Sequence, residues 1–254
     1  MSFEVSADEY LQFMGKYSEQ LASRFIEFAD VRPGHRVVDV GAGPGALTAQ
    51  LVDRVGTRGV IAIDPSRSFV HALRARLPEV DVRIGSAEHL PFPDAQFDAS
   101  LAQLVVHFMA DPSAGIAEMA RVTRPGGVVA ACVWAQGRGP VSDFAAVVRE
   151  FDPAGSAGIE PENDQGGREG QLVALCTAAG LTDVVGAELT VQREFADFQA
   201  WWSPLLLRVG PAGAYVAQLD EPRRAELREL CAARFPDGPF TITATAWAAS
   251  GRAR

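Results

Sequence analysis

The stretch Val37-Val38-Asp39-Val40-Gly41-Ala42-Gly43-Pro44-Gly45 is the most informative part of this 254-residue sequence. A short β-branched run ends in three glycines spaced two residues apart, and a helical pattern follows at once. Glycines permit a sharp turn and a close approach of the backbone to a ligand, because they carry no Cβ. The stretch therefore predicts a buried strand, a loop that contacts a ligand, and a helix.

A second apolar run, Val60-Ile61-Ala62-Ile63, ends at Asp64, some 20 residues after the glycines. In βαβ units that bind nucleosides, an acid at the tip of the second strand accepts hydrogen bonds from the ribose hydroxyls. Pro65, directly after this acid, suits a turn from strand into helix. The two stretches together predict a nucleoside-binding crevice.

Charge and hydropathy exclude several kinds of partner. Asp and Glu number 32 against 23 Lys and Arg, which gives a formal net charge of −9 without a clustered basic stretch. This balance argues against binding to nucleic acid or to an anionic membrane. No apolar run approaches the ~20 residues of a membrane helix. The polar N-terminus, Met1 to Glu9, is not typical of a signal peptide, so we expect a cytoplasmic protein.

The three cysteines are Cys132, Cys176 and Cys231, and they lie far apart on apolar stretches. We interpret them as small core residues. No group of His, Cys, Asp or Glu residues has metal-ligand spacing, so the expected site contains no metal.

Strands and helices alternate along the first half of the chain, which predicts a parallel sheet with helices on both faces. We expect an α/β fold, a Rossmann-like doubly wound seven-stranded sheet that is mostly parallel with an antiparallel last strand. The predicted strands cover residues 36–40, 60–64, 82–84, 97–104, 128–134, 183–193 and 240–248.

The sequence predicts a single domain, residues 1–254, in three parts. Residues 1–34 form an N-terminal helical cap, with one helix or two that break near Gly15. Residues 35–135 form the cofactor-binding core, and residues 136–254 the substrate-side half. That half contains a mobile loop at 152–170, with five glycines and two prolines, and a helical insert at 196–235 before the last strand.

A loose dinucleotide fingerprint is present as Gly41-x-Gly43-x-x-Ala46. It leaves a nicotinamide-dependent oxidoreductase open as an alternative. Three features oppose that alternative: Asp39 occupies a strand position that is usually apolar, Pro44 stiffens the loop, and the second half is not another mononucleotide-binding repeat.

The sequence resembles the class I S-adenosylmethionine-dependent methyltransferases, and is closest to the ubiquinone/menaquinone-biosynthesis methyltransferase-like branch, in which it looks like a bacterial subgroup. Residues 38–45 look like the family's first motif. Gly85-Ser86-Ala87-Glu88 resembles the family's adenine-side loop, and Phe97-Asp98 to Gln103 resembles its fourth strand. Arg124-Pro125-Gly126-Gly127 resembles the turn before the fifth strand.

The resemblance implies a cofactor, S-adenosyl-L-methionine, and a role for each matched residue. The methionine part lies over Gly41, Ala42 and Gly43, with Asp39 at its amino end, and Asp64 accepts the ribose hydroxyls. The remaining implied cofactor contacts are Tyr10, Tyr17, Pro65, Ser86, Ala87, Glu88 and Gln103. Ser86 stands where the family usually has an acid, which removes a charge-assisted bond to adenine.

The acceptor side is less defined by the sequence. His107, four residues past Gln103, is the candidate general base, because histidine accepts protons near neutral pH; alternatively it caps the loop before Asp111. Tyr10 and Tyr17 either cover the crevice or dock the cap helix on the core. The candidate walls of an apolar substrate pocket are Trp134, Trp201 and Trp202, although one of the adjacent pair is expected to pack the insert instead.

The resemblance implies a methyltransferase (EC 2.1.1.-), and we expect it to act on an O, N or C atom of a small, apolar or aromatic molecule. We expect no nucleic-acid or membrane partner and a monomer or homodimer. An alternative is a member of the same fold that binds S-adenosylmethionine and catalyses a reaction other than methylation.

Overall fold

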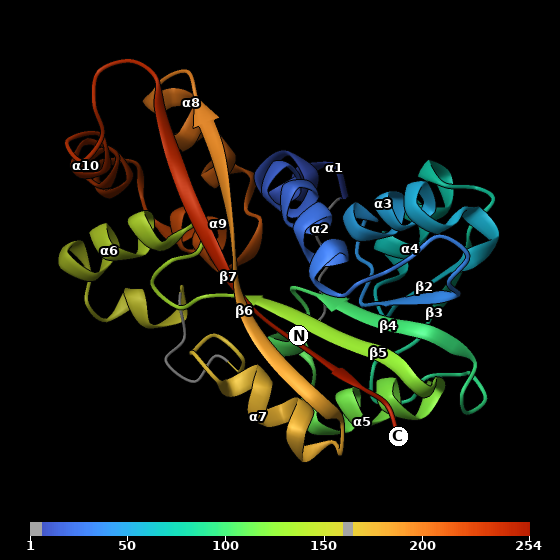
Figure 1. The fold of residues 1–254 in the computed structure, drawn as a ribbon. Coiled ribbons are helices and arrows are strands. Elements are labelled where there is room, and N and C mark those ends of the chain that lie inside the picture. Colours follow the sequence, from blue (N-terminus) through green and yellow to red (C-terminus); the bar gives the residue numbers. More distant parts are fainter. Residues whose placement is uncertain (1–6, 160–164) are drawn as a thin grey trace.

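A seven-stranded sheet in the order β3-β2-β1-β4-β5-β7-β6 forms the centre of the computed structural model, which describes residues 7–159 and 165–254 (Figure 1). The strands are β1 (Val37–Val40), β2 (Val60–Asp64), β3 (Asp81–Ile84), β4 (Phe97–Gln103), β5 (Thr123–Trp134), β6 (Thr182–Phe195) and β7 (Phe240–Arg252). Strands β1 to β5 are parallel, whereas β7 runs antiparallel to both β5 and β6. The predicted fold class is confirmed.

Helices cover both faces of the sheet, as the burial pattern of β1 requires. Every residue of β1 is buried, so alternate side chains enter the two cores. Helices α2, α3 and α4 pack on one face, and α5 and α7 on the other. The helical elements are α1 (Ala7–Tyr10), η1 (Leu11–Gly15), α2 (Lys16–Phe28), α3 (Ala46–Val55), η2 (Thr57–Gly59), α4 (Arg67–Arg76), η3 (Val106–Phe108), α5 (Pro112–Val122), α6 (Ser142–Phe151), η4 (Gly155–Gly158), α7 (Gln171–Ala178), α8 (Phe198–Trp202), η5 (Ser203–Leu207), α9 (Gly210–Gln218) and α10 (Glu221–Ala232).

Strands β6 and β7 continue beyond the rest of the sheet as a two-stranded ribbon. The pairing of β5 with β7 ends at Trp134 and Ala246, but β6 and β7 stay paired as far as Phe195 and Phe240. The helices α8 to α10 are inserted between these two strands and lie beside the ribbon, next to α6 (Figure 1). The ribbon thus carries the insert predicted at 196–235.

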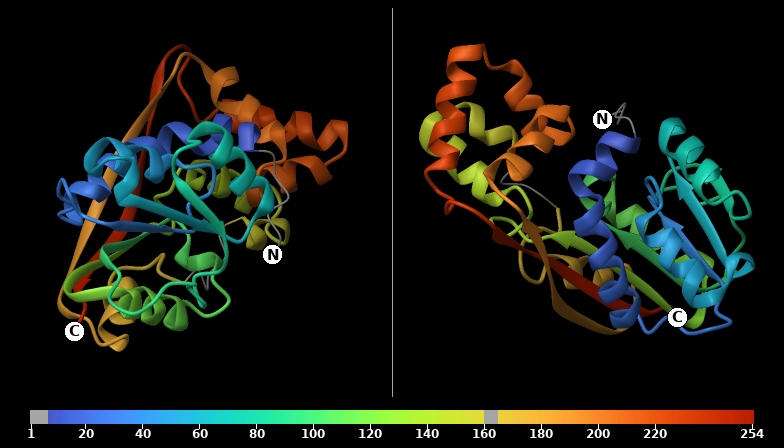
Figure 2. Two further views of the ribbon diagram at one scale, coloured as in Figure 1. Left: turned by 90° about the vertical axis from the view of Figure 1, so that its right-hand side faces the viewer. Right: turned by 90° about the horizontal axis from the view of Figure 1, so that it is seen from above.

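The N-terminal segment is one continuous helical rod rather than two helices. A π-helical turn, η1, joins α1 to α2 at the position of the expected break near Gly15. Seen from above, the rod lies between the insert and the helices of the core (Figure 2). The segment therefore stands where a cap over the crevice was predicted, although residues 1–6 lie outside the described residues.

Two predicted loops differ in detail from the structure. The turn at 124–127 is an irregularity inside β5, because Phe97 pairs with Thr123 while Ala99 already pairs with Val128. The segment 152–170 contains the short helix η4, and residues 160–164 of the predicted mobile loop lie outside the described residues.

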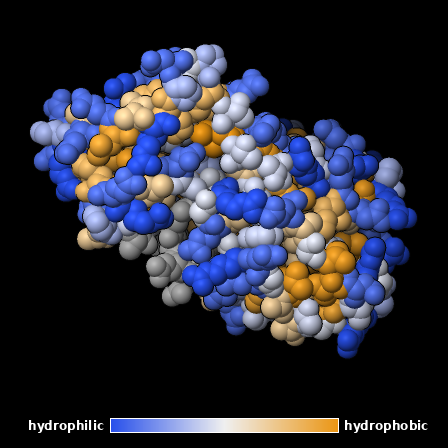
Figure 3. Space-filling view, turned by 60° about the vertical axis from the view of Figure 1, so that its left-hand side comes forward, coloured by the Kyte–Doolittle hydropathy of each residue, from blue (hydrophilic) through white to orange (hydrophobic). Residues whose placement is uncertain are grey.

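The surface is mixed in character. On the face drawn in Figure 3, hydrophilic side chains predominate and hydrophobic ones gather in separate areas. The large hydrophobic residues that are exposed come from different elements, which is ordinary for a protein surface: Ile84, Phe108, Val185, Leu206 and Leu230. Within the described residues, no helix combines the length and the hydropathy needed to cross a membrane.

Candidate active site

A cavity of about 740 Å³ opens at the carboxyl ends of β1, β2 and β4. Its size lies within the usual range for small-molecule sites, ~300–1,000 Å³. Eight of the twelve predicted cofactor residues line it: Tyr10, Asp39, Gly41, Ala42, Gly43, Asp64, Pro65 and Gln103. The other lining residues are Ser18, Pro44, Ala46, Leu47, Ser66, Arg67, Ser68, Phe69, Leu104, Val105 and Phe108.

The glycine loop forms one wall of the cavity. Gly43 has a φ of +54°, and a Cβ at this position would meet no atom within 4 Å, so the backbone faces open space. Gly41 has a φ of +72°, and a Cβ there would lie 2.3 Å from the Val105 side chain. The loop is thus a bare peptide surface that a ligand can approach closely.

Asp39 is a buried carboxyl group below this loop, with 1% exposure. Its Oδ2 accepts a hydrogen bond from Thr48 Oγ1 at 2.6 Å. Burial raises the pKa of Asp39 to about 7, the nearby Asp64 carboxylate acts in the same direction, and the Thr48 hydrogen bond opposes them. The site therefore holds an acid whose charge depends on pH near neutrality and which a cationic group would favour in its ionised form.

Asp64 is the second buried carboxyl group of the cavity, and it is hydrogen-bonded to the glycine loop. Its Oδ2 accepts from the Gly43 amide and its Oδ1 from the Ser66 amide, each at 2.8 Å. Burial raises the pKa of Asp64 above its ordinary value, and these two amides oppose the effect. The carboxylate is held at the tip of β2, on the wall of the cavity.

The cap rod contributes Tyr10 and Ser18 to the cavity wall. The ring of Tyr10 lies 5.6 Å from that of Phe69, centroid to centroid, and burial raises the pKa of the tyrosine. Ser18 accepts a hydrogen bond at its carbonyl from Gln103 Nε2, at 3.0 Å. The rod is therefore tied to the end of β4 across the cavity.

Leu104 turns the chain sharply at the end of β4. Its φ is +60°, which is strained for a leucine, and its amide donates to the Cys132 carbonyl. Because Leu104 lies between Gln103 and Val105, this conformation places three consecutive residues on the cavity wall.

The predicted adenine-side residues do not line the cavity in this structure. Ala87 is buried in the core on the α5 side of the sheet. Glu88 Oε1 accepts from the amides of Ala110 and Asp111, at 2.8 and 3.4 Å, so it braces the loop that precedes α5. Ser86 is likewise absent from the cavity lining.

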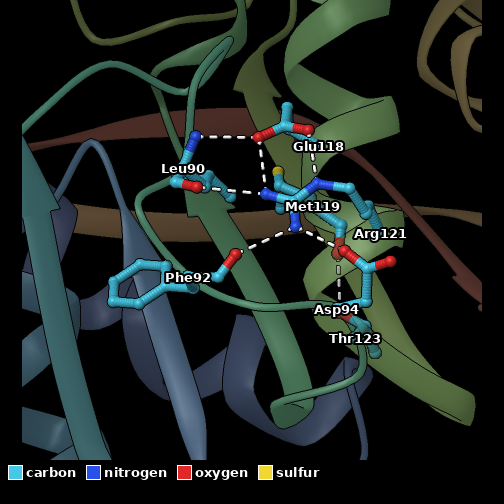
Figure 4. Close-up of polar contacts among 7 residues, drawn as sticks. All are labelled: Leu90, Phe92, Asp94, Glu118, Met119, Arg121 and Thr123. Atoms are coloured by element: carbon cyan, nitrogen blue, oxygen red, sulfur yellow. Dashed lines mark hydrogen bonds and ion pairs between the residues drawn. The ribbon is translucent and has the colours of Figure 1, made fainter.

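A polar network from α5 fixes the adenine-side loop (Figure 4). Arg121 donates to the carbonyls of Leu90 and Phe92, at 3.0 and 2.9 Å, and pairs with Asp94 and Glu118. Glu118 Oε2 in turn accepts from the Leu90 amide at 2.9 Å. The adenine-side loop is thereby anchored to α5 through its own backbone.

His107, the predicted base, lies in η3 after β4 but does not line the cavity. Its ring contacts that of Phe108, with the centroids 3.9 Å apart, and its Nδ1 is buried without a hydrogen-bond partner. Burial lowers the pKa of His107 to about 4. The imidazole is neutral at pH 7, and η3 would have to rearrange to bring it to an acceptor.

Tyr17 and Trp134 lie beside a second, narrower cleft between the cap rod, β6 and the insert. The Tyr17 ring lines this cleft rather than the large cavity, and meets the Trp134 ring edge-on at 6.4 Å. The cleft is lined by Phe13, Met14, Tyr17, Pro140, Val141, Phe144, Arg193, Phe195, Trp201, Pro204 and Leu205.

Both tryptophans of the adjacent pair are packed, Trp201 within the insert and Trp202 against α6. Trp201 lies 4.5 Å from Phe235 and Trp202 lies 6.5 Å from Phe144, between ring centroids. Trp201 also lines the second cleft, whereas Trp202 lines neither cavity. The predicted contact of these residues with substrate stays a prediction, and of the two only Trp201 lines a cleft.

Sequence reasoning missed Thr48, Ser18, Phe69 and Phe108 as parts of the site. Phe69 and Thr48 sit in helices that directly follow the two strand tips, a position that could have marked them. Ser18 and Phe108 carry no such signal, because only the packing of the cap rod and of η3 brings them to the cavity.

Comparisons with known proteins agree with this architecture. Residues 38–131 match the family model of a methyltransferase domain. An uncharacterized methyltransferase of Mycobacterium tuberculosis is 45% identical over 92 residues, 36% of this chain and 37% of that protein. A ubiquinone/menaquinone biosynthesis C-methyltransferase of Cupriavidus pinatubonensis is 37% identical over 109 residues, 41% of this chain and 45% of that protein. The matched segments span less than half the length of these two relatives.

Among solved structures, a phosphoethanolamine N-methyltransferase of Haemonchus contortus, in complex with phosphomonomethylethanolamine and S-adenosylhomocysteine, has a similar fold. The identity is 15% and the TM-score 0.58, over 98% of this chain and 57% of that one. Residues 38–131 thus form a methyltransferase domain, and the motifs in their order and the sheet topology agree with the class I S-adenosylmethionine-dependent methyltransferases.

Proposed function

We propose that this chain transfers the methyl group of S-adenosylmethionine to an O, N or C atom of a small, apolar or aromatic molecule. The observation that carries the proposal is one cavity whose wall combines a bare glycine loop with two buried carboxyl groups, Asp39 and Asp64. A ligand that carries a cationic amine and a ribose, and that lies along the open glycine loop, would satisfy these groups.

The residues of the cavity suit the cofactor, position by position. Asp39 would take the amino group of its methionine part, which favours the ionised carboxylate. Asp64 would accept the ribose hydroxyls, and Tyr10 with Phe69 would cover the bound molecule. When bound, the cofactor supplies a methyl group on a sulfonium, which is already a good leaving group. The chain's contribution is then to orient donor and acceptor and to exclude water.

One observation favours the alternative, a reaction other than methylation. Among the described residues that line the cavity, the groups able to accept a proton are Asp39, Asp64 and Tyr10, and this proposal gives all three to the cofactor. A base must therefore come from elsewhere, and His107 remains our proposal for it.

Calorimetry with S-adenosylmethionine and S-adenosylhomocysteine tests the binding step directly. We expect both to bind, and absence of binding at high micromolar protein and ligand would contradict the proposal. Mass spectrometry of candidate acceptors then separates the two functions: a methylated product with release of S-adenosylhomocysteine supports transfer. Turnover of an acceptor without a gain of a methyl group supports the alternative.

A further inference from the structure

Arg193 is a half-buried cation on the extended part of β6. Its guanidinium carbon lies 5.5 Å from the centroid of the Tyr17 ring and 4.6 Å from that of Phe195. Its Nη1 donates to the Phe13 carbonyl, at 2.9 Å. Burial lowers the pKa of Arg193, and no carboxylate among the described residues forms an ion pair with it. A desolvated cation without a counter-ion is costly, so this site would gain from an anion.

The contact with Phe13 does not by itself explain an arginine at this position. A neutral amide could donate to the same carbonyl, and the positive charge would not be needed. The protein is acidic overall, yet the carboxylate that acts on Tyr17 electrostatically, Asp143, forms no ion pair with Arg193. Among the described residues, the partners of this cation are thus the Phe13 carbonyl and the rings of Tyr17 and Phe195, and none of them carries a negative charge.

Unpaired polar atoms gather between Arg193 and the large cavity. The side-chain atoms Tyr17 Oη, Gln103 Oε1 and Trp134 Nε1 are buried without a hydrogen-bond partner. Leaving such atoms unpaired destabilises the folded state, and native proteins rarely do so without a reason. Together they offer a donor, an acceptor and a hydroxyl to a polar ligand.

The topology brings these atoms to one place. Gln103 pairs with Cys132 in the sheet, so Gln103, Cys132 and Trp134 direct their side chains to the same face, below α2. Tyr17 and Ser18 are neighbours in α2, one lining the cleft and the other the cavity. The cluster therefore stands at the wall that separates the donor cavity from the cleft of Arg193.

We propose that the methyl acceptor is a planar apolar molecule with an anionic oxygen group such as a carboxylate, and that Arg193 binds this anion. The inference rests on the proposed function and adds the class of the acceptor. The rings of Tyr17, Phe144 and Trp201 hold the apolar body, while the end that receives the methyl group lies near Gln103 and Trp134. The cleft has about 20 Å³ of free space, so binding of the acceptor requires the cap rod to shift.

The experiment compares matched acids and esters. Calorimetry of the full chain with saturating S-adenosylhomocysteine measures the binding of benzoate, naphthoate and indoleacetate, each beside its methyl ester. We expect at least one acid to bind wild type about tenfold or more tightly than its ester, the scale of one charge-assisted hydrogen bond. In R193Q, which keeps a donor for Phe13, acid and ester should bind equally; R193K should retain part of the preference.

R228Q is the matched control, because Arg228 also lies over an aromatic ring, 5.3 Å from Phe198, but in the insert. It should keep the full preference for the acid. The inference is overturned if every acid binds wild type no better than its ester, or if R193Q keeps the preference. The wild-type comparison stands even if R193Q does not fold. If wild type does not bind S-adenosylhomocysteine at all, the proposed function is contradicted instead. The two outcomes are therefore distinguishable.

Discussion

Asp64 Oδ2 accepts a hydrogen bond from the amide of Gly43 at 2.8 Å, which joins the tip of β2 to the glycine loop. The two motifs that define the crevice are therefore in direct contact. A ribose hydroxyl that donates to Asp64 Oδ2 competes with the Gly43 amide for the same oxygen. The affinity for the cofactor therefore depends on how well this carboxylate can accept both hydrogen bonds.

Asp64→Ala should weaken the binding of S-adenosylhomocysteine by roughly 1–3 kcal/mol, about fivefold to 150-fold, because it removes a charged acceptor. Asp64→Asn is the matched variant, since its amide oxygen can still accept from Gly43 while the charge is lost. Calorimetry measures both. Unchanged affinity in Asp64→Ala would remove this residue from the cofactor site.

Asp39 should make the stability of the free protein depend on pH. Burial raises the pKa of Asp39 to about 7 in the folded state, from 3.8. The protonated form is thus favoured by folding, so its stabilising contribution is complete below about pH 4 and is lost as the pH rises through about 7. Asp39→Asn cannot ionise and should lack this loss.

Urea unfolding at about pH 5 and about pH 8 checks this expectation, with the exposed Asp53→Asn in α3 as control. The free energy of unfolding of Asp39→Asn should fall less between these pH values than that of wild type and of the control. An equal fall in all three proteins would show that Asp39 is ionised in the folded state over the whole range.

His107→Ala tests the proposed base. If His107 takes the acceptor's proton, turnover should fall by about 10²–10⁴-fold while the affinity for S-adenosylhomocysteine stays nearly intact, because the ring does not line the cavity. His71→Ala, an exposed histidine of α4, serves as control and should keep wild-type turnover. Wild-type turnover in His107→Ala would leave loop packing as the role of this residue.

Arg121→Ala should lower the free energy of unfolding by about 1–3 kcal/mol, because the buried carbonyls of Leu90 and Phe92 lose a charged donor. Arg121→Lys should recover only part of this loss, since an ammonium cannot reproduce the planar fork. Urea unfolding measures both variants, and hydrogen exchange at the Leu90 amide reports the loop itself. Exchange at the wild-type rate in Arg121→Ala would show that Glu118 holds the loop alone.

The fold was predictable because its signals are local. Glycines at 41, 43 and 45 and an acid at 64 mark strand tips, and the alternation of apolar runs gives the order of strands and helices. The placement of Tyr17, Glu88 and His107 was not predictable to the same degree. Each lies in a helix or loop whose orientation depends on packing against distant segments, so neighbours in sequence such as Tyr17 and Ser18 face different cavities.

The sequence by itself determined the strand–loop–helix around residues 37–45, the acid that faces it and the family to which these motifs belong, because turn chemistry and strand periodicity act over a few residues. Only the tertiary structure decided which side chains share the cavity, that Asp39 is buried beside Asp64, and that Arg193 meets Tyr17 from 176 positions away. Burial and electrostatic coupling are properties of neighbours in space, and the chain order does not contain them.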